Sequence, residues 1–392
     1  KNKDVIIAEN KTVHSDTEVN LEAKKKILVE ENATLQSQKK TLVQAQHLEN
    51  RGEIHGTSEA EIKVQDHLFN TQGAKINSDH NLKITANTLD NAGKIKGQGP
   101  TDIQATTLIK NAKEGKIISG KGLTITGGSL QNDGAIRSGE NTTITLTQNL
   151  QNIAGVIWSA RDLKVTSSAF DNAGTIGGKG TVSMEVNGLI KNARGGKIIS
   201  EEMLTFNGDS LENEGSISSE KDLTIALNQN LKNNRGLIYS NQDMHLHVDG
   251  PIENSHGDIL IGGDLFVKGN KNPKTTFLEN VSGFIETMAG NITIFAKKMT
   301  NHRRVDFGTS APINTGNKTK GSKTTKDIVI HEEPMGYILS AGNITIDADE
   351  TENIYSTIAA GQDIIINGKD LKNTSKVLQE KIGSWQTVYP KT

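Results

Sequence analysis

The chain has 392 residues, and its 44 basic and 46 acidic side chains give a formal charge of -2, which offers no whole-chain attraction for nucleic acid or an anionic membrane. It contains no cysteine, which excludes disulfides, thiol chemistry and zinc–thiolate sites. Hydrophobic residues make up 33% and aromatic residues 4%, too little for a large spherical core but enough for a thin one of small side chains.

An asparagine recurs every 20 or 21 residues, two places after Leu, Ile or Phe and shortly before Gly. A fixed period this short predicts a solenoid in which each unit buries its apolar face against its neighbours. Stacked amides can hydrogen bond along the solenoid axis as a ladder, and Asn tolerates the left-handed backbone of a tight corner. The predicted ladder consists of Asn50, Asn70, Asn91, Asn111, Asn132, Asn152, Asn172, Asn192, Asn213, Asn233 and Asn254.

Each unit also carries three short apolar segments, one of which is formed by Leu223, Ile225 and Leu227 with the period of two that is typical of a strand. Strands of three to five residues cannot pair inside so short a unit, so each should stack on its equivalent in the next unit, about 4.8 Å away. We therefore predict an all-β fold, a parallel β-helix of about 17 coils and on the order of 80 Å long. Inward positions would be Leu211, Ile217, Leu223 and Ile225.

Domain boundaries follow from where the repeat changes. Residues 1–268 keep the period and form the regular shaft, whereas residues 269–373 form modified coils. Between Asn301 and Ile338 the chain is far longer than a turn requires, which predicts an extra-helical loop at 302–337. The periodicity ends after Asn373, so residues 374–392 are either a cap or the start of a next segment.

The long loop is the candidate binding region, because long loops on rigid scaffolds are where binding usually resides. The alternatives are a mobile solubilising loop or a hairpin that merely covers the shaft. Its candidate residues are basic, and the aromatic residues near the C-terminus join them: Arg303, Arg304, Lys318, Lys320, Lys323, Lys326, Trp385 and Tyr389.

A second candidate surface is an apolar stripe. Ile118, Trp158, Ile199 and Tyr239 occupy one outward position at two-coil spacing, on the coils with longer turns, while Arg137 and small residues fill the coils between. Such a stripe could be a lateral contact surface, or it could pack beneath the longer turns.

For the other polar clusters a structural role is a better explanation than a binding site. Asp222, Asp243 and Asp264 share a turn position in successive coils, as Asp162 does earlier, and Asx-turns explain them better than a calcium site. His245 and His247 share a strand face, but the repeat places no third metal ligand beside them. We expect no metal, no cofactor and no enzymatic activity, since paired carboxylates at controlled separation and nucleophile motifs are missing from the sequence.

The turn LxNxGxI followed by a strand such as Leu123-Thr124-Ile125 resembles the filamentous haemagglutinin repeats of bacterial two-partner secretion exoproteins. The later segments Ala289-Gly290-Asn291-Ile292-Thr293-Ile294 and Ile338-Leu339-Ser340-Ala341-Gly342-Asn343-Ile344-Thr345-Ile346 look like the passage from repeat shaft to receptor-binding region in CdiA-type members. This resemblance covers most of residues 40–373.

The resemblance implies a right-handed β-helix, exported through an outer-membrane transporter and displayed on a Gram-negative cell. In CdiA-type members the filament binds an outer-membrane protein or lipopolysaccharide on a target cell and delivers a toxin in contact-dependent growth inhibition. The alternative is an adhesin that binds host glycans or proteins without toxin delivery. We expect a monomeric rod that does not bind nucleic acid.

Overall fold

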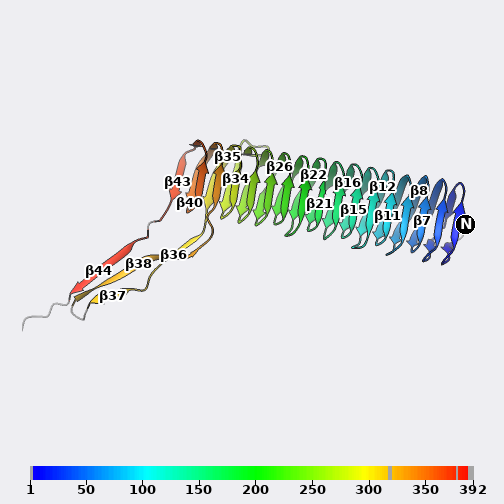
Figure 1. Cartoon of the computed structure of the whole chain (residues 1–392), viewed down its shortest axis with the longest axis horizontal. Helices are drawn as coiled ribbons and strands as arrows, with labels where there is room; N and C mark the ends of the chain where they lie inside the picture. Colours follow the sequence, from blue (N-terminus) through cyan, green and yellow to red (C-terminus); the bar gives the residue numbers. More distant parts are fainter. Residues whose placement is uncertain (1–2, 317–319, 377, 387–392) are drawn as a thin grey trace, which may run out of the picture.

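The structure is a computed structural model that describes residues 3–316, 320–376 and 378–386. It is a parallel β-solenoid from which a thin arm projects near the C-terminal end (Figure 1). All of its regular elements within the described ranges are strands. The prediction of an all-β, parallel β-helical fold is confirmed.

One face of the solenoid, the narrow sheet, has 16 strands, one per coil. These strands are β2 (Thr12–Ser15), β5 (Thr34–Ser37), β7 (Glu53–Gly56), β9 (Lys75–Ser78), β11 (Lys94–Gly97), β13 (Lys116–Ser119), β15 (Ala135–Ser138), β18 (Val156–Ser159), β21 (Thr175–Gly178), β23 (Lys197–Ser200), β25 (Ser216–Ser219), β28 (Leu237–Ser240), β31 (Asp258–Ile261), β34 (Phe284–Thr287), β39 (Tyr337–Ser340) and β41 (Thr357–Ala360).

The remaining two sides of each coil belong to one bent sheet of 24 strands, the broad sheet. Its strands are β1 (Asp4–Ile7), β3 (Val19–Glu22), β4 (Lys26–Val29), β6 (Lys40–Asn50), β8 (Glu59–Asn70), β10 (Asn81–Asn91), β12 (Thr101–Asn111), β14 (Leu123–Asn132), β16 (Thr142–Leu146), β17 (Asn149–Asn152), β19 (Leu163–Ser167), β20 (Ala169–Asn172), β22 (Val182–Asn192), β24 (Leu204–Asn213), β26 (Leu223–Leu227), β27 (Leu231–Asn234), β29 (Met244–Val248), β30 (Pro251–Ser255), β32 (Leu265–Lys268), β33 (Thr275–Val281), β35 (Ile292–His302), β40 (Ile344–Ile354), β42 (Ile364–Asn367) and β43 (Asp370–Thr374).

Strand length in the broad sheet differs from the prediction of separate short strands. In several coils two of the three predicted segments join into one bent strand, as in β10, whose 11 residues turn the corner. The register between β10 and β12 shifts between Ala86 and Thr88, so a bulge absorbs the bend. Two of the predicted short strands can therefore form one continuous strand that bends at the corner.

The core is a thin column of apolar side chains between the two sheets. Leu211, Ile217, Leu223 and Ile225 are each 0% exposed, which confirms their predicted inward positions. Along each strand, buried and partly exposed residues alternate, as the period of two requires. The outward side chains alone are therefore available for contacts with partners.

The asparagine ladder is present and buried. From Asn50 to Asn254 each Nδ2 donates to the Oδ1 of the next rung at 2.8 Å, and the series continues through Asn280 and Asn301 to Asn353 and Asn373. The Oδ1 of Asn50 has no partner because Val29 occupies the equivalent place in the preceding coil. The ladder is thus a continuous seam along one corner.

That seam crosses the long insertion without interruption. The Nδ2 of Asn301 reaches the Oδ1 of Asn353 at 3.0 Å, although the two residues are 52 apart in sequence. The chain leaves after Asn301 and rejoins at Gly336, where a Cβ would lie 2.7 Å from the Oδ1 of Asn301. Glycine at this point lets the returning backbone approach the ladder closely.

Candidate functional site: the projecting arm

The inserted segment and the C-terminal segment together form one antiparallel sheet, which we call the arm. It contains β36 (Val305–Thr309), β37 (Ile313–Gly316), β38 (Lys320–Glu332) and β44 (Glu380–Gln386). Figure 1 shows these strands extending away from the shaft as a single layer. The arm is the largest departure from the repeat.

Strand β38 is the central strand of the arm. Its base half pairs with β36 and its outer half with β37, while β44 pairs along its other edge from Lys326↔Glu380 to Lys320↔Gln386. The β-branched residues Ile328, Val329 and Ile330 favour a strand at this position.

Two sequence predictions differ from this arrangement. Residues 302–337 were predicted to be a loop, but strands occupy much of that range because β38 has partners on both edges. Residues 374–392 were predicted to be a cap or the start of a next segment, whereas β44 completes the arm.

A group of side chains fixes the base of the arm to the shaft. The Nη1 of Arg303 lies 3.2 Å from the carboxylate of Glu332 and donates to the carbonyl oxygen of Glu333 at 3.3 Å. The Glu333 carboxylate in turn accepts from the hydroxyl of Ser282 at 3.3 Å and lies 3.6 Å from the Nε2 of His256. Arg303, predicted to bind a receptor, therefore anchors the arm.

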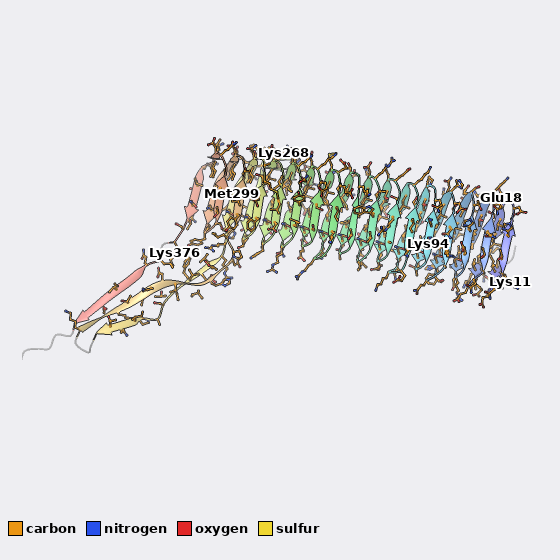
Figure 2. The ribbon with its side chains drawn as sticks, viewed as in Figure 1. Lys11, Glu18, Lys94, Lys268, Met299 and Lys376 are labelled. Carbon is orange, nitrogen blue, oxygen red and sulfur yellow. The ribbon has the colours of Figure 1, made fainter. Side chains whose placement is uncertain are left out.

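The linker to β44 closes the other side of the base. The ring of Phe307 packs edge-on against Tyr355 with centroids 5.6 Å apart, and the Nζ of Lys376 lies 4.0 Å from the Phe307 centroid. Lys376 also pairs with the carboxylate of Asp327 at 3.8 Å, and Figure 2 shows it where the arm meets the shaft. These contacts join residues far apart in the chain, so no periodic pattern in the sequence marks them.

The predicted basic residues are distributed over different parts of the arm. Arg304 is exposed and pairs with the neighbouring Asp306 at 3.0 Å, and Lys323 is exposed on β38. Lys320 and Lys326 lie near the two ends of the β38–β44 pairing. The backbone of Trp385 lies in β44 opposite Gly321. Lys318 and Tyr389 lie outside the described residues.

The arm also presents apolar side chains that the sequence prediction did not select. Ile313 is 56% exposed and Ile382 is 69% exposed, and both flank Thr324 across the sheet. Ile330 is 68% exposed near the base. A single-layer sheet has no inner face in which to bury these residues, so they remain available to a partner. Ile328, Val329 and Ile330 are consecutive in the sequence, so no alternation of apolar and polar residues marks which of them faces outward.

The four residues of the predicted lateral stripe lie on the narrow sheet. The register places Ile118, Trp158, Ile199 and Tyr239 in one outward row, each half-buried, with Arg137, Gly177 and Ser218 between them. A Cβ at Gly177 would lie 2.9 Å from the Cζ3 of Trp158, so this indole packs over the neighbouring coil.

The stacked aspartates accept hydrogen bonds from backbone N–H groups of the following coil. The carboxylate of Asp222 accepts from the N–H of Asp243 at 3.1 Å, and that of Asp243 accepts from the N–H of Asp264 at 2.8 Å. The carboxylate of Asp162 likewise accepts from the N–H of Thr181. These bonds connect successive coils, whereas an Asx-turn would close within its own coil.

His245 and His247 form an aromatic group with Phe266. Their ring centroids are 5.9 Å apart, and each meets the Phe266 ring edge-on. Burial lowers the pKa of His247, and the charges of Lys268 and His245 lower it further. Within the described ranges no group of three or more His, Cys, Asp or Glu side chains could hold a metal ion.

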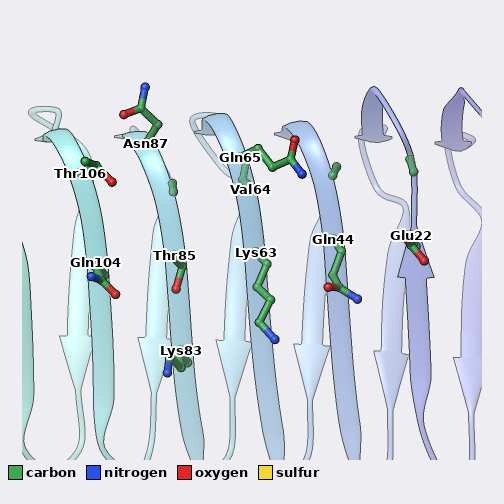
Figure 3. A pocket seen from close by; sticks show the side chains of 13 residues that line it. Glu22, Gln44, Lys63, Val64, Gln65, Lys83, Thr85, Asn87, Gln104 and Thr106 are labelled. Atoms are coloured by element: carbon green, nitrogen blue, oxygen red, sulfur yellow. The ribbon is translucent and has the colours of Figure 1, made fainter.

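A shallow groove of about 550 Å³ runs along the broad sheet near the N-terminal end (Figure 3). It follows the bends of β6, β8, β10 and β12, where bulges shift the register. Its lining is polar and includes the side chains of Gln44, Lys63, Lys83, Thr85 and Gln104. Its lining residues come from separate coils, so no local sequence motif marks the groove. No helix in the described part of the chain is long and apolar enough to span a membrane.

Comparison with protein families gives one match. The Haemagglutinin repeat family model matches residues 54–112, 97–154, 158–234, 203–270 and 336–380. No curated protein and no solved structure matches the chain significantly. The matched ranges together cover well over half of the chain, and they omit residues 271–335, where most of the arm lies.

Proposed function

This chain belongs to the Haemagglutinin repeat family, and we propose that it is an adhesin-like shaft whose arm binds a receptor on the surface of another cell. The repeats indicate a secreted or surface-exposed protein, in which a long rigid shaft provides reach. In a shaft of stacked coils every coil repeats the same backbone geometry, and the arm is the largest departure from that repeat, as long segments that bind partners on rigid scaffolds often are.

One observation carries this proposal: the arm is an addition to a shaft that stays continuous beneath it. The ladder bond from Asn301 to Asn353 joins the coils on either side of the insertion. The arm is held at its base by Arg303, Phe307 and Lys376 and exposes Ile313, Ile382 and Lys323 farther out. Ile313 and Ile382 share one face of the sheet through their common partner Thr324, whereas Lys323 lies on the opposite face, and exposed apolar side chains gathered on one face are typical of a protein-binding surface.

We further propose that the protein acts in CdiA-type contact-dependent growth inhibition. In that case an outer-membrane transporter exports it, it stays associated with a Gram-negative outer membrane, and the arm recognises an outer-membrane protein or lipopolysaccharide on the target cell. The resemblance of residues 289–346 to the passage into a receptor-binding region supports this assignment. The proposal involves recognition alone, with no catalytic step or cofactor.

A second candidate is an adhesin that binds host glycans, and the polar groove favours it. Carboxamides, hydroxyls and ammonium groups from successive coils line the groove, as hydrogen bonding to an extended chain of sugars requires. In this case the shaft itself would carry the binding site.

Point substitutions distinguish these two candidates. Under the receptor proposal, Ile382→Asp and Ile313→Asp should each reduce attachment to target cells at least about tenfold, because the two side chains share one face of the arm and each change places an unfavourable charge in the contact. Lys83→Glu in the groove and the shaft control Lys121→Glu should have little effect. The measurement is binding of the purified, labelled chain to whole cells. Loss with Lys83→Glu alone would reject the arm and support the glycan groove.

A further inference from the structure

The outward side of the narrow sheet changes character along the shaft. In each strand the first and third residues face outward, and from β2 to β13 these positions carry many charges, including Glu53, Lys75, Lys94 and Lys96. From β15 to β41 only Arg137, Lys197, Asp258 and Glu286 are charged among the outward positions. We call this second part, the outward residues of β15 to β41, the apolar face.

Large apolar side chains recur along the apolar face in both outward rows. One row contains Val156, Leu237, Phe284 and Tyr337, and the other contains the predicted stripe members Trp158, Ile199 and Tyr239. The rings of Phe284 and Tyr337 stack with centroids 4.7 Å apart, and Phe284 is 37% exposed. On the successive strands β28, β31, β34 and β39 such side chains, with Leu260 and Leu339 among them, form a contiguous apolar surface, which marks an interaction site.

We propose that the apolar face pairs with the same face of a second copy of this chain, with the two shafts antiparallel. The face spans ten strands spaced about 4.8 Å apart and four residues of about 3.3 Å each, or roughly 600 Å² per copy. Two such faces bury about 1,200 Å², the lower limit for a stable protein–protein interface. This inference is independent of the receptor proposal, and it departs from the expected monomeric rod.

Charge complementarity selects the antiparallel arrangement. The face carries its cations, Arg137 and Lys197, toward the N-terminal end and its anions, Asp258 and Glu286, toward the C-terminal end. Parallel pairing would bring like charges to the same level along the two shafts, whereas a two-fold axis between β25 and β28 brings β23 of one copy over β31 of the other. Lys197 then faces Asp258 in the same outward row.

The same register also matches large residues with small ones. It places Leu237 over Ser216 and Tyr239 over Ser218, because β25 of one copy lies over β28 of the other. Complementary sizes allow two sheets to approach to about 10 Å, the usual spacing of packed sheets.

Since the arm emerges just before β39, the antiparallel pair carries one arm toward each end.

Sedimentation of the whole chain tests the pairing. We expect a mass of twice 42.3 kDa. Leu237→Glu should weaken the association of the dimer at least about tenfold. The control Asn77→Glu, on the charged part of the same sheet, should leave the association unchanged. Asp258→Lys should also weaken the dimer, and combining it with Lys197→Asp should restore it. Both charged side chains are exposed, so these variants keep the fold. A mass of 42.3 kDa at concentrations up to about 100 μM, or no restoration by the double variant, would overturn the proposal.

Orientation is measured with a spin label at Arg137→Cys, since the chain has no other cysteine. Antiparallel pairing separates the two labels by nine coils, or about 45 Å. A separation of about 10 Å would show a parallel pair and contradict the arrangement.

Discussion

Replacing Asn172 by alanine is expected to lower the free energy of unfolding of the shaft by about 3–5 kcal/mol. Its side chain is 0% exposed, accepts from the Nδ2 of Asn152 and donates to the Oδ1 of Asn192, both at 2.8 Å. It also donates to the carbonyl oxygens of Gly174 and Lys197. Alanine leaves these buried groups without partners, and each unpaired group costs about 1–3 kcal/mol.

The matched control is Asn373→Ala at the exposed last rung, which should cost less than about 1 kcal/mol. Urea unfolding followed by circular dichroism gives the comparison. Because a solenoid can unfold in sections, hydrogen exchange of the amides around each rung should accompany it. Equal small effects at both positions would mean that the amide ladder contributes little to the shaft.

Replacing Thr324 by proline is expected to unfold the arm while leaving the shaft intact. Thr324 is paired on both sides, with Ile313 and with Ile382, so proline removes a ladder hydrogen bond at the centre of the sheet. The cost of about 3 kcal/mol or more exceeds what a single-layer antiparallel sheet can absorb. Thr324→Ala, which keeps the backbone donor, is the control.

Hydrogen exchange measures this result directly. Protection should fall together in β36, β37, β38 and β44, while amides of β40 and the other shaft strands keep theirs. Unchanged protection in β44 would show that the C-terminal strand is not part of the arm.

The shaft could be predicted because every coil has the same structural requirements. Each coil buries its apolar side chains in one column and pairs one corner amide with the next coil, so spacing alone located Asn172 and the inward Ile217. The arm offers no such repetition: β44 pairs with β38 across more than 50 residues of sequence, and only folding of the intervening coils brings them together. Periodicity therefore marked where the arm begins and could not identify its partner strand.

Residue type alone does not show which partners a side chain has in the fold. Arg303 was predicted from its charge to bind a receptor, yet Glu332 and Glu333 hold it at the base of the arm. The predicted stripe follows one outward position of the strands, so it omits Leu237 and Phe284 in the neighbouring row. It includes Ile118, although the strand β13 lies in the charged part of the sheet. Neighbouring rows become visible only when the strand register is known.

Receptor binding by the arm can be tested by measuring how a chain that lacks residues 304–335 attaches to target cells. The deletion joins Arg303 to Gly336 and gives Asn301-His302-Arg303-Gly336, the spacing of Asn254-Ser255-His256-Gly257 in an uninterrupted coil. Arg303 would then take the corner position that His256 fills at a φ of 52°. The ladder from Asn280 through Asn353 should remain protected from hydrogen exchange. We expect an intact shaft that no longer attaches to target cells, whereas full attachment by an intact shaft would show that the arm is not the receptor-binding part.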